Sequence, residues 1–401
     1  MKKMTNWEEL QWRGLVKDVA GENIEDLINN KSVTFYWGTD PTADSLHLGH
    51  YSSLVTAKRL MKMGHNPILL CGGATGRIGD PRPTAEREIM SIDALNHNIE
   101  CIKKQIDKIF DGKAKLVNNY EWFKDYNFLD FLRDVGKYIN VNYMLSKDII
   151  QRRLESGITY AEFSYMLIQG YDFLHMYETM NCTMQVEGSD QWGNITTGIE
   201  LIRKMKGKEA YAFTMPLILD KTGKKFGKSE GNALWLDKEK TSPYLIYQYL
   251  LNSDDSKVIE YLKVFTFLNK EEIDALEEKV KTEPEKREAQ KTLAYEVVKD
   301  LHGVEEAEKA KKTSEKVFTK GYSSEGMPSE TIEYKDNMNL MDILVMTKIT
   351  TSKSEARRLI IGNGISVNNE KELNPERIFT KEEINDLIIS KGKKTHIKVN
   401  L

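Results

Sequence analysis

The first third of the chain places a cluster of turn-forming residues between a predicted strand and a predicted helix. Residues 32–37 are rich in β-branched and aromatic side chains, which indicates a strand. Apolar residues then recur at helical spacing up to Gly64, and residues 68–71 form a continuous apolar run typical of a strand buried on both faces. Strand, helix and strand in this order form a βαβ unit, which requires parallel strands. We therefore predict an α/β fold built on a parallel sheet.

Ligands of such sheets bind beyond the carboxyl ends of the strands. Tyr36, Asp40 and Asp80 fall at this edge of the predicted sheet. Residues 72–81 are rich in glycine, which allows the backbone to approach a ligand closely. We expect the functional site here.

The turn between the first strand and the helix carries His47, Gly49 and His50. The two histidines lie three residues apart, so on a first helical turn they point the same way. A helix N-terminus offers unpaired N–H groups and a positive dipole, which suit a phosphate. Two histidines beside a turn are also common on plain surfaces, so these residues alone leave both interpretations open.

A second candidate site lies on the predicted helix 160–179, whose apolar residues cover nearly all sides. This helix also carries Tyr165, Gln169 and Asp172, which fall on a single stripe. Burying an amide and a carboxylate is costly unless they are hydrogen-bonded. Either neighbouring side chains or a polar ligand must satisfy them.

Two later segments carry further candidates. Asp190 lies in the turn 188–194 between a predicted strand and a helix, where an acidic residue either caps the helix or binds a ribose hydroxyl. Residues 220–232 contain four lysines and three glycines, which indicates a cationic loop or a solvated surface.

Composition sets the limits of the function. The 401 residues are sufficient for two or three domains, and 58 basic against 61 acidic residues give a net charge of −3, so any RNA contact must be local. The three cysteines form no CxxC pair, which fits a reducing compartment and no structural zinc. With no apolar run of 18 residues and no signal-peptide pattern, we expect a cytoplasmic protein without a membrane partner.

The C-terminal part changes character twice. Residues 240–320 are helical and charged, 321–337 resemble a flexible linker, and 338–401 regain order. This tail has eleven basic and eight acidic residues, and Lys353, Arg357 and Arg358 precede a predicted strand that contains glycine. The tail is either an RNA-binding module or a capping subdomain.

Four motifs together resemble a known family. Residues 47–50 resemble the His-x-Gly-His element of class I aminoacyl-tRNA synthetases, and residues 38–47 narrow the resemblance to the bacterial-type tyrosyl-tRNA synthetases. Residues 188–194 and 225–229 resemble this family's Gly-Ser-Asp-Gln-Trp-Gly-Asn run and its form of the Lys-Met-Ser-Lys-Ser element. Glu187 departs from the glycine expected before the third motif.

The resemblance implies a Rossmann-like parallel-sheet catalytic domain over residues 1–237, with an aromatic, dimer-forming insertion around 120–150. A helical anticodon-side domain over 238–320, the linker 321–337 and a small S4-like α+β RNA-binding domain over 338–401 would follow. The implied partners are tRNA(Tyr), L-tyrosine, ATP with accompanying Mg²⁺, and a second copy of the chain.

The resemblance also implies a role for each candidate residue in the activation of tyrosine by ATP. The expected catalytic residues are Thr42, His47 and His50, which would bind the triphosphate, with Lys225 and Lys228, which would contact the leaving pyrophosphate. The expected ATP-binding residues are Asp40, Gly49, Asp190, Lys228 and Ser229. The expected tyrosine-binding residues are Tyr36 and Asp172 for the phenol, Asp80, Tyr165 and Gln169 for the ammonium group, and Gln191 near the carboxyl group. Lys353, Arg357 and Arg358 would bind RNA, and no metal held by protein ligands is expected.

Three other functions remain to be compared with this one. A tryptophanyl-tRNA synthetase is the alternative within the family, and the expected phenol-binding pair and the S4-like tail argue against it. A cytidylyltransferase shares the histidine element but has no need of the tail. A non-catalytic RNA-binding protein would explain the tail and leave the buried polar stripe without a use.

Overall fold

The computed structural model describes residues 4–82, 89–229, 232–318, 329–368, 370–385, 387–392 and 395–401. It divides into two compact units. Unit 1 comprises Met1–Asp237 with Glu260–Leu268, and unit 2 comprises Lys238–Ile259 with Asn269–Leu401. Among the described residues, no helix combines the length and the apolar character needed to cross a membrane.

Unit 1 is built on a six-stranded sheet in the order β1-β6-β5-β2-β3-β4. Its strands are β1 (Val19–Ala20), β2 (Thr34–Thr39), β3 (Asn66–Cys71), β4 (Lys115–Asn118), β5 (Met184–Gly188) and β6 (Tyr211–Met215). All neighbouring strands are parallel except β1, which runs antiparallel to β6. A two-stranded ribbon of β7 (Lys228–Ser229) and β8 (Asn232–Ala233) stands apart from this sheet.

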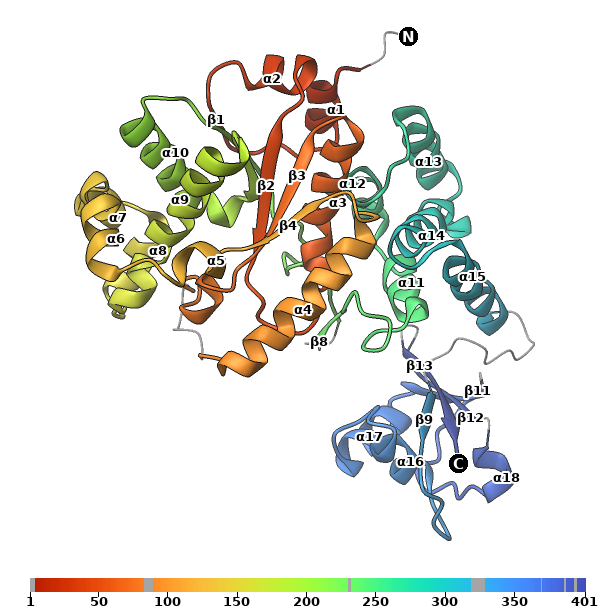
Figure 1. Cartoon of the computed structure of the whole chain (residues 1–401). Helices are drawn as coiled ribbons and strands as arrows, with labels where there is room; N and C mark the ends of the chain where they lie inside the picture. Colours follow the sequence, from red (N-terminus) through yellow and green to blue (C-terminus); the bar gives the residue numbers. More distant parts are fainter. Residues whose placement is uncertain are drawn as a thin grey trace. The chain divides into compact units, whose positions relative to one another are not determined.

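Helices flank the sheet on both sides (Figure 1). Those that precede or connect the strands are α1 (Asn6–Trp12), α2 (Ile24–Asn30), α3 (Leu48–Lys62), α4 (Ile92–Ile109), α9 (Tyr160–Met180) and α10 (Trp192–Lys206). The helix α9 packs closely along α10, and its Phe173, Leu174 and Met176 share a buried cluster with Ile68 and Leu70 of β3. This packing explains why α9 is apolar around most of its circumference.

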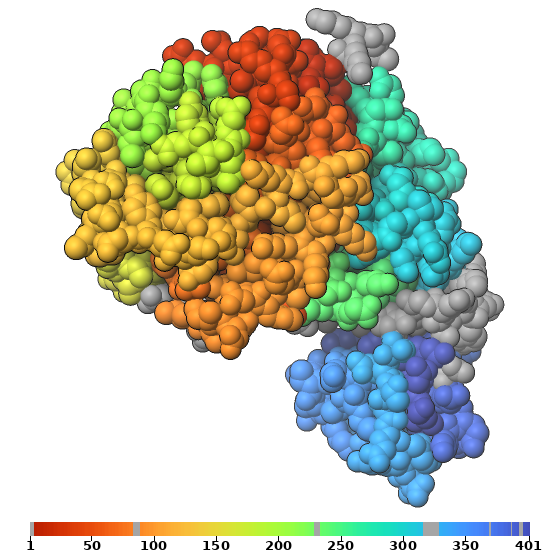
Figure 2. All heavy atoms as spheres, viewed as in Figure 1, coloured from red at the N-terminus to blue at the C-terminus, as the bar shows by residue number. Residues whose placement is uncertain are grey.

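Between β4 and α9 the chain forms an insertion of short helices. These are α5 (Tyr120–Phe123), α6 (Phe128–Asp134), α7 (Val141–Leu145) and α8 (Asp148–Leu154). In Figure 2 this insertion, coloured amber to yellow, lies at the outer surface of unit 1. A small core formed by Val135, Met144 and Ile150 packs it against Met166 and Leu167 of α9.

Unit 2 begins with helices. They are α11 (Pro243–Leu251), α12 (Asp255–Phe265, whose second half belongs to unit 1), α13 (Lys270–Thr282), α14 (Glu288–His302) and α15 (Val304–Phe318). Ser242 caps α11, and Pro243 occupies its first position, where a missing N–H costs nothing. α14 packs along both α11 and α15, which buries an apolar stripe of α14 that includes Leu293 and Val297.

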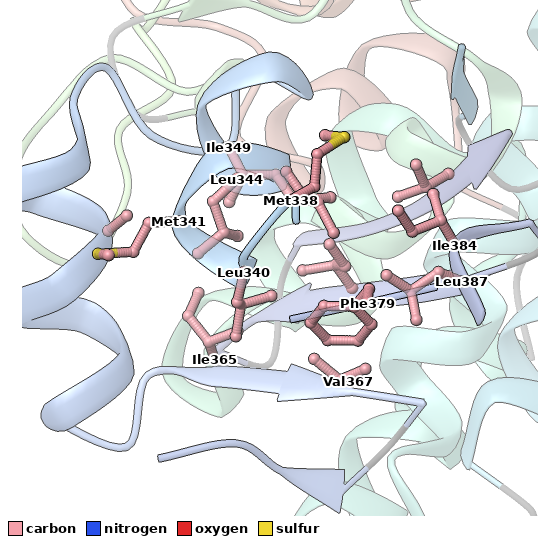
Figure 3. Packing of buried hydrophobic residues seen from close by; sticks show 14 of the residues in the cluster. Met338, Leu340, Met341, Leu344, Ile349, Ile365, Val367, Phe379, Ile384 and Leu387 are labelled. Carbon is pink, nitrogen blue, oxygen red and sulfur yellow. The ribbon is translucent and has the colours of Figure 1, made fainter. Parts of the chain in front are cut away.

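The C-terminal part of unit 2 is a five-stranded sheet in the order β11-β10-β12-β13-β9. Its elements are β9 (Ser329–Thr331), α16 (Leu340–Met346), α17 (Lys353–Ile361), β10 (Ile365–Val367), β11 (Glu370–Lys371), α18 (Lys381–Ile384), β12 (Leu387–Lys391) and β13 (Thr395–Asn400). Figure 3 shows Phe379 at the centre of its core, between Val367 of the sheet and residues of the helical side such as Leu340. This part therefore has a hydrophobic core of its own.

The predicted α/β class is confirmed, with a helical region and a small C-terminal α+β part following the sheet. The sheet is mixed rather than entirely parallel, because the two residues of β1 add an antiparallel edge. A strand of two residues leaves no periodic pattern in the sequence. The predicted domain limits stay predictions, and residues 319–328 of the predicted linker lie outside the described residues.

Candidate active site

A cavity of about 380 Å³ opens at the carboxyl edge of the sheet in unit 1. It lies where β2 has β3 on one side and β5 on the other, which is the position where open α/β sheets bind ligands. The cavity has the size of a small-molecule site. Thirteen of the predicted residues line it: Tyr36, Asp40, Thr42, His47, Gly49, His50, Asp80, Tyr165, Gln169, Asp172, Asp190, Gln191 and Lys225.

The two histidines form the N-terminus of α3. The Nδ1 atom of His47 accepts a hydrogen bond from the Gly49 amide at 3.1 Å, and Nδ1 of His50 accepts one from the His47 amide at 3.3 Å. The rings stack with centroids 3.8 Å apart. Nδ1 accepts a hydrogen bond in each ring, so Nε2 is the remaining ring nitrogen of each histidine that can carry a proton.

Gly49, which lies between the two histidines, has no room for a larger side chain. A Cβ atom at Gly49 would lie 2.8 Å from the His47 ring and 3.3 Å from the Phe226 carbonyl oxygen. At Gly227, whose φ is +86°, a Cβ atom would lie 2.6 Å from the Gly49 amide. The backbone of the loop 220–229, which carries the lysines, therefore lies directly against the start of α3.

An aromatic cluster fixes the base of this loop. Phe226 is 5% exposed, and its ring centroid lies 4.7 Å from that of Phe265 and 4.6 Å from that of Tyr261. Lys225 beside it is exposed and lines the cavity. The side chains of Lys228 and Ser229 lie outside the described part of the structure.

Carboxylates surround the middle of the cavity. Asp40 accepts hydrogen bonds from the hydroxyl groups of Thr75 at 2.6 Å and Tyr165 at 2.9 Å. Asp80 accepts from the side-chain amides of Gln191 at 3.0 Å and Asn194 at 3.1 Å. Burial, followed by the charges of Asp40 and Asp80, raises the pKa of Tyr165 well above its usual value. A cation placed here would therefore be stabilised by several carboxylates.

Tyr36 and Asp172 both line the cavity, and each is 1% exposed. After burial, the charge of Asp172 is the main cause that raises the pKa of Tyr36. Asp172 accepts hydrogen bonds from the Asn119 amide at 3.1 Å and the Trp122 indole N–H at 2.9 Å. Burial raises the pKa of Asp172 to about 8, although both hydrogen bonds lower it. A carboxyl group held between two donors in an apolar surrounding is a selective partner for a hydroxyl group.

Two buried polar atoms that line this cavity have no hydrogen-bond partner of normal geometry among the described residues. They are the hydroxyl oxygen of Tyr36 and Oε1 of Gln169. Burial, followed by the charges of Asp172 and Glu187, raises the pKa of Tyr36 well above its usual value, and a side-chain contact with Gln185 lowers it. Unsatisfied buried polar groups are rare in folded proteins, and their position here points to a polar ligand.

Sequence reasoning missed several residues of this site. Trp122, which donates to Asp172, lies in the predicted aromatic insertion, and Asn119, Thr75 and Asn194 were not singled out. Asn119 directly follows β4, so its place at the carboxyl end of a strand was an available signal. Lys353, Arg357 and Arg358 lie exposed on α17 of unit 2, outside the lining of this cavity.

Comparison with known families assigns the chain to a class of protein. Residues 28–319 match the family described as tRNA synthetases class I (W and Y), so the chain belongs to the class I aminoacyl-tRNA synthetases of the tryptophan and tyrosine branch. Residues 319–399 match the tyrosine–tRNA ligase SYY-like C-terminal domain. The chain therefore has the activity of a tyrosine–tRNA ligase, and as a member of the class I family it uses ATP.

Solved structures agree with this assignment. The C-terminally truncated mitochondrial tyrosyl-tRNA synthetase of Aspergillus nidulans is 32% identical over 79% of this chain and 95% of its own length, with a TM-score of 0.71. The corresponding enzyme of Coccidioides posadasii is also 32% identical, over 78% of this chain and 92% of its own length, with a TM-score of 0.69. A tryptophanyl-tRNA synthetase from Encephalitozoon cuniculi, 14% identical with a TM-score of 0.57 over 76% of this chain and 87% of its own length, shares the fold.

Proposed function

We propose that this cavity forms tyrosyl-adenylate from L-tyrosine and ATP, with the residues that line it in the roles given below. The single observation that carries the assignment is the buried pair Tyr36 and Asp172 at the deep end of the cavity. A hydroxyl without a partner beside a carboxyl group suits the phenol of tyrosine, which can donate one hydrogen bond and accept another. An indole N–H could donate to Asp172 but could not accept from Tyr36.

Adenylate formation is the attack of the tyrosine carboxylate on the α-phosphorus of ATP, with pyrophosphate as the leaving group. The reaction needs no protein nucleophile, so the enzyme acts by alignment and by stabilising charge. Asp40, Asp80, Tyr165 and Gln169 surround the position of the ammonium group in this proposal. Gln191, held by Asp80, then faces the reacting carboxyl group.

The phosphates occupy the other end of the cavity. His47 and His50 direct Nε2–H donors to the triphosphate, and Thr42 lines the same wall. The lysines 225 and 228 stabilise the negative charge that develops on the leaving pyrophosphate, while Gly49 and Ser229 border the nucleotide and Asp190 binds its ribose.

Mg²⁺ accompanies ATP in this proposal and offsets part of its phosphate charge. Among the described residues, no group of three or more His, Cys, Asp or Glu side chains could hold a metal ion.

The second step transfers the tyrosyl group to the 3′ end of tRNA(Tyr). We assign residues 1–237 as a Rossmann-like catalytic domain, 238–320 as the anticodon-side helical domain, 321–337 as the linker and 338–401 as an S4-like RNA-binding domain. The support for the last is the exposed basic face of α17 with Lys353, Arg357 and Arg358. Such a face binds phosphates through local charge, although the whole chain is slightly acidic.

A homodimer through the insertion is also part of the proposal. Large apolar side chains are exposed on α6, α7 and the ends of α8 and α9, and such patches mark interfaces. They are Phe128 (60% exposed), Leu129 (72%), Val141 (57%), Leu154 (45%) and Tyr160 (65%). A charged residue at Leu129 would then shift the molar mass in solution towards the monomer. A cytoplasmic location stays a prediction.

The test is pyrophosphate exchange, which measures adenylate formation without tRNA. We expect exchange with tyrosine and ATP, and little exchange when tryptophan replaces tyrosine or CTP replaces ATP. Exchange that depends on tryptophan would contradict the assignment of Tyr36 and Asp172. Absence of exchange with any amino acid would contradict the catalytic assignment altogether.

A further inference from the structure

The cavity contains a carboxyl group to which neither the resemblance nor the mechanism above gives a role. Glu187 on β5 stands where this family's motif is expected to have glycine. Its side chain is 5% exposed and lines the cavity. A buried carboxyl group is costly to maintain, so its partners need to be identified.

One partner is the backbone of β2. The parallel pairing of β2 with β5 ends at Tyr36 and Gln185, so Gly38 lies beyond the last paired residue. The Gly38 amide donates to Oε1 of Glu187 at 2.5 Å, which replaces the lost ladder bond. The other oxygen, Oε2, makes no hydrogen bond with the described residues, and Glu187 lines the cavity.

The second relevant neighbour is Asp190. A Cβ atom on Gly188 would lie 2.7 Å from Oδ1 of Asp190, so this carboxylate folds back over the glycine that follows Glu187. Both carboxyl groups line the same cavity. Burial, and then the charges of Asp190 and Asp40, raise the pKa of Glu187 well above its usual value. Its partner must therefore tolerate a protonated as well as an ionised carboxyl group.

A ribose has the required chemistry. Each of its hydroxyl groups can both donate and accept a hydrogen bond, and the 2′ and 3′ hydroxyl groups stand next to each other. We propose that Glu187 is a further nucleotide-binding residue, which holds one hydroxyl group of the ATP ribose through Oε2 while Asp190 holds the other. This inference rests on the proposed function and adds a second ribose contact to it.

The alternative is a purely structural role, in which Glu187 does no more than replace a ladder bond at Gly38. The two roles differ in what they predict for nucleotide analogues. A ribose contact makes the enzyme discriminate against ATP that lacks one hydroxyl group, and removal of Glu187 abolishes that discrimination. A structural residue changes the binding of ATP and its deoxy analogues by the same factor.

The experiment compares pyrophosphate exchange with ATP, 2′-deoxy-ATP and 3′-deoxy-ATP in the full-length enzyme and in the variants Glu187→Ala, Glu187→Gln and Asp190→Ala. For Glu187→Ala we expect KM for ATP to rise about three- to tenfold, the effect of one hydrogen bond, and discrimination against one analogue to fall by the same factor. Asp190→Ala should lose discrimination against the other analogue. Glu187→Gln keeps an acceptor for Gly38 and a donor for the ribose, so its KM for ATP should stay within about twofold of the parent enzyme.

Two results would overturn the inference. One is unchanged discrimination against both analogues in Glu187→Ala, and the other is a matching loss of tyrosine affinity, which indicates a general distortion of the site. Glu187→Met, which retains the length of the side chain, replaces the alanine variant if that variant does not fold. Failure of the proposed function is distinct, because the parent enzyme would then show no exchange that depends on tyrosine.

Discussion

Replacing Tyr36 by phenylalanine should raise the free energy of unfolding of the ligand-free protein and at the same time weaken its binding of tyrosine. The Tyr36 hydroxyl is buried at 1% exposure without a hydrogen bond of normal geometry to the described residues. A buried polar group in this state costs about 1–3 kcal/mol, and the nearby Gln185 amide recovers part of that cost. We therefore expect the free energy of unfolding of unit 1 to rise by up to about 1 kcal/mol in the variant.

The effect on the substrate has the opposite sign. In the complex, the Tyr36 hydroxyl gains the tyrosine phenol as a partner, which is worth about 0.5–1.5 kcal/mol for a neutral hydrogen bond. The variant should therefore bind tyrosine about 2- to 13-fold more weakly. Use of phenylalanine as a substrate should stay nearly unchanged, because it has no hydroxyl group to lose.

Tyr244 provides a matched control. Its hydroxyl is also buried without a normal hydrogen bond, at 2% exposure, and it also lies beside a glutamine amide, that of Gln248. Tyr244 belongs to unit 2 and does not line the cavity. Tyr244→Phe should therefore match Tyr36→Phe in its effect on stability and leave tyrosine affinity unchanged.

The assays are urea denaturation of the ligand-free protein and equilibrium titration with tyrosine. A loss of about 1 kcal/mol or more in the free energy of unfolding of Tyr36→Phe would mean that the hydroxyl already has a good partner and would contradict the prediction. An affinity for tyrosine that stays within error of the parent value would place the phenol elsewhere.

Three further predictions concern Lys228, Asp172 and the basic residues of α17. Lys228→Ala should lower the maximal rate of pyrophosphate exchange at least about tenfold and leave the dissociation constant of tyrosine nearly unchanged, because the lysine acts on charge that develops in the transition state; equal losses in rate and affinity would contradict this. The pKa of Asp172 is about 8 in the folded protein and about 4 in the unfolded chain. The contribution of this group to the stability of the folded protein should therefore be highest below about pH 4 and should fall as the pH rises towards about 8. Melting curves between pH 5 and 8 should therefore show a loss of at most about 1.4 kcal/mol per pH unit that Asp172→Asn lacks. Changing Arg357 and Arg358 to glutamate, or ending the chain near residue 323, should abolish most tRNA charging while exchange continues, and a joint loss would show that the two activities are not separable.

Much of the fold and of the site could be predicted because parallel strands bring their carboxyl ends to one edge. His47 follows β2, Asp80 follows β3 and Asp190 follows β5, so a single βαβ pattern predicts that they converge. The cavity contains all three. β1 was missed, because two residues of edge strand leave no period in the sequence.

Contacts between side chains could not be predicted in the same way, because they depend on the order of the strands and on where a ladder ends. Asn119 and Trp122 donate hydrogen bonds to Asp172 of α9 although they lie 53 and 50 positions before it in the chain. Glu187 was visible in the sequence as a departure from glycine, but its meaning depends on the end of the β2–β5 pairing beside Gly38. A carboxyl group at that position satisfies a backbone amide with one oxygen and presents the other to the cavity, and a glycine can do neither. If Glu187 binds the ribose as proposed, it affects both the hydrogen bonding of Gly38 and the binding of ATP. A comparison of ATP with its two deoxy analogues then separates the two effects.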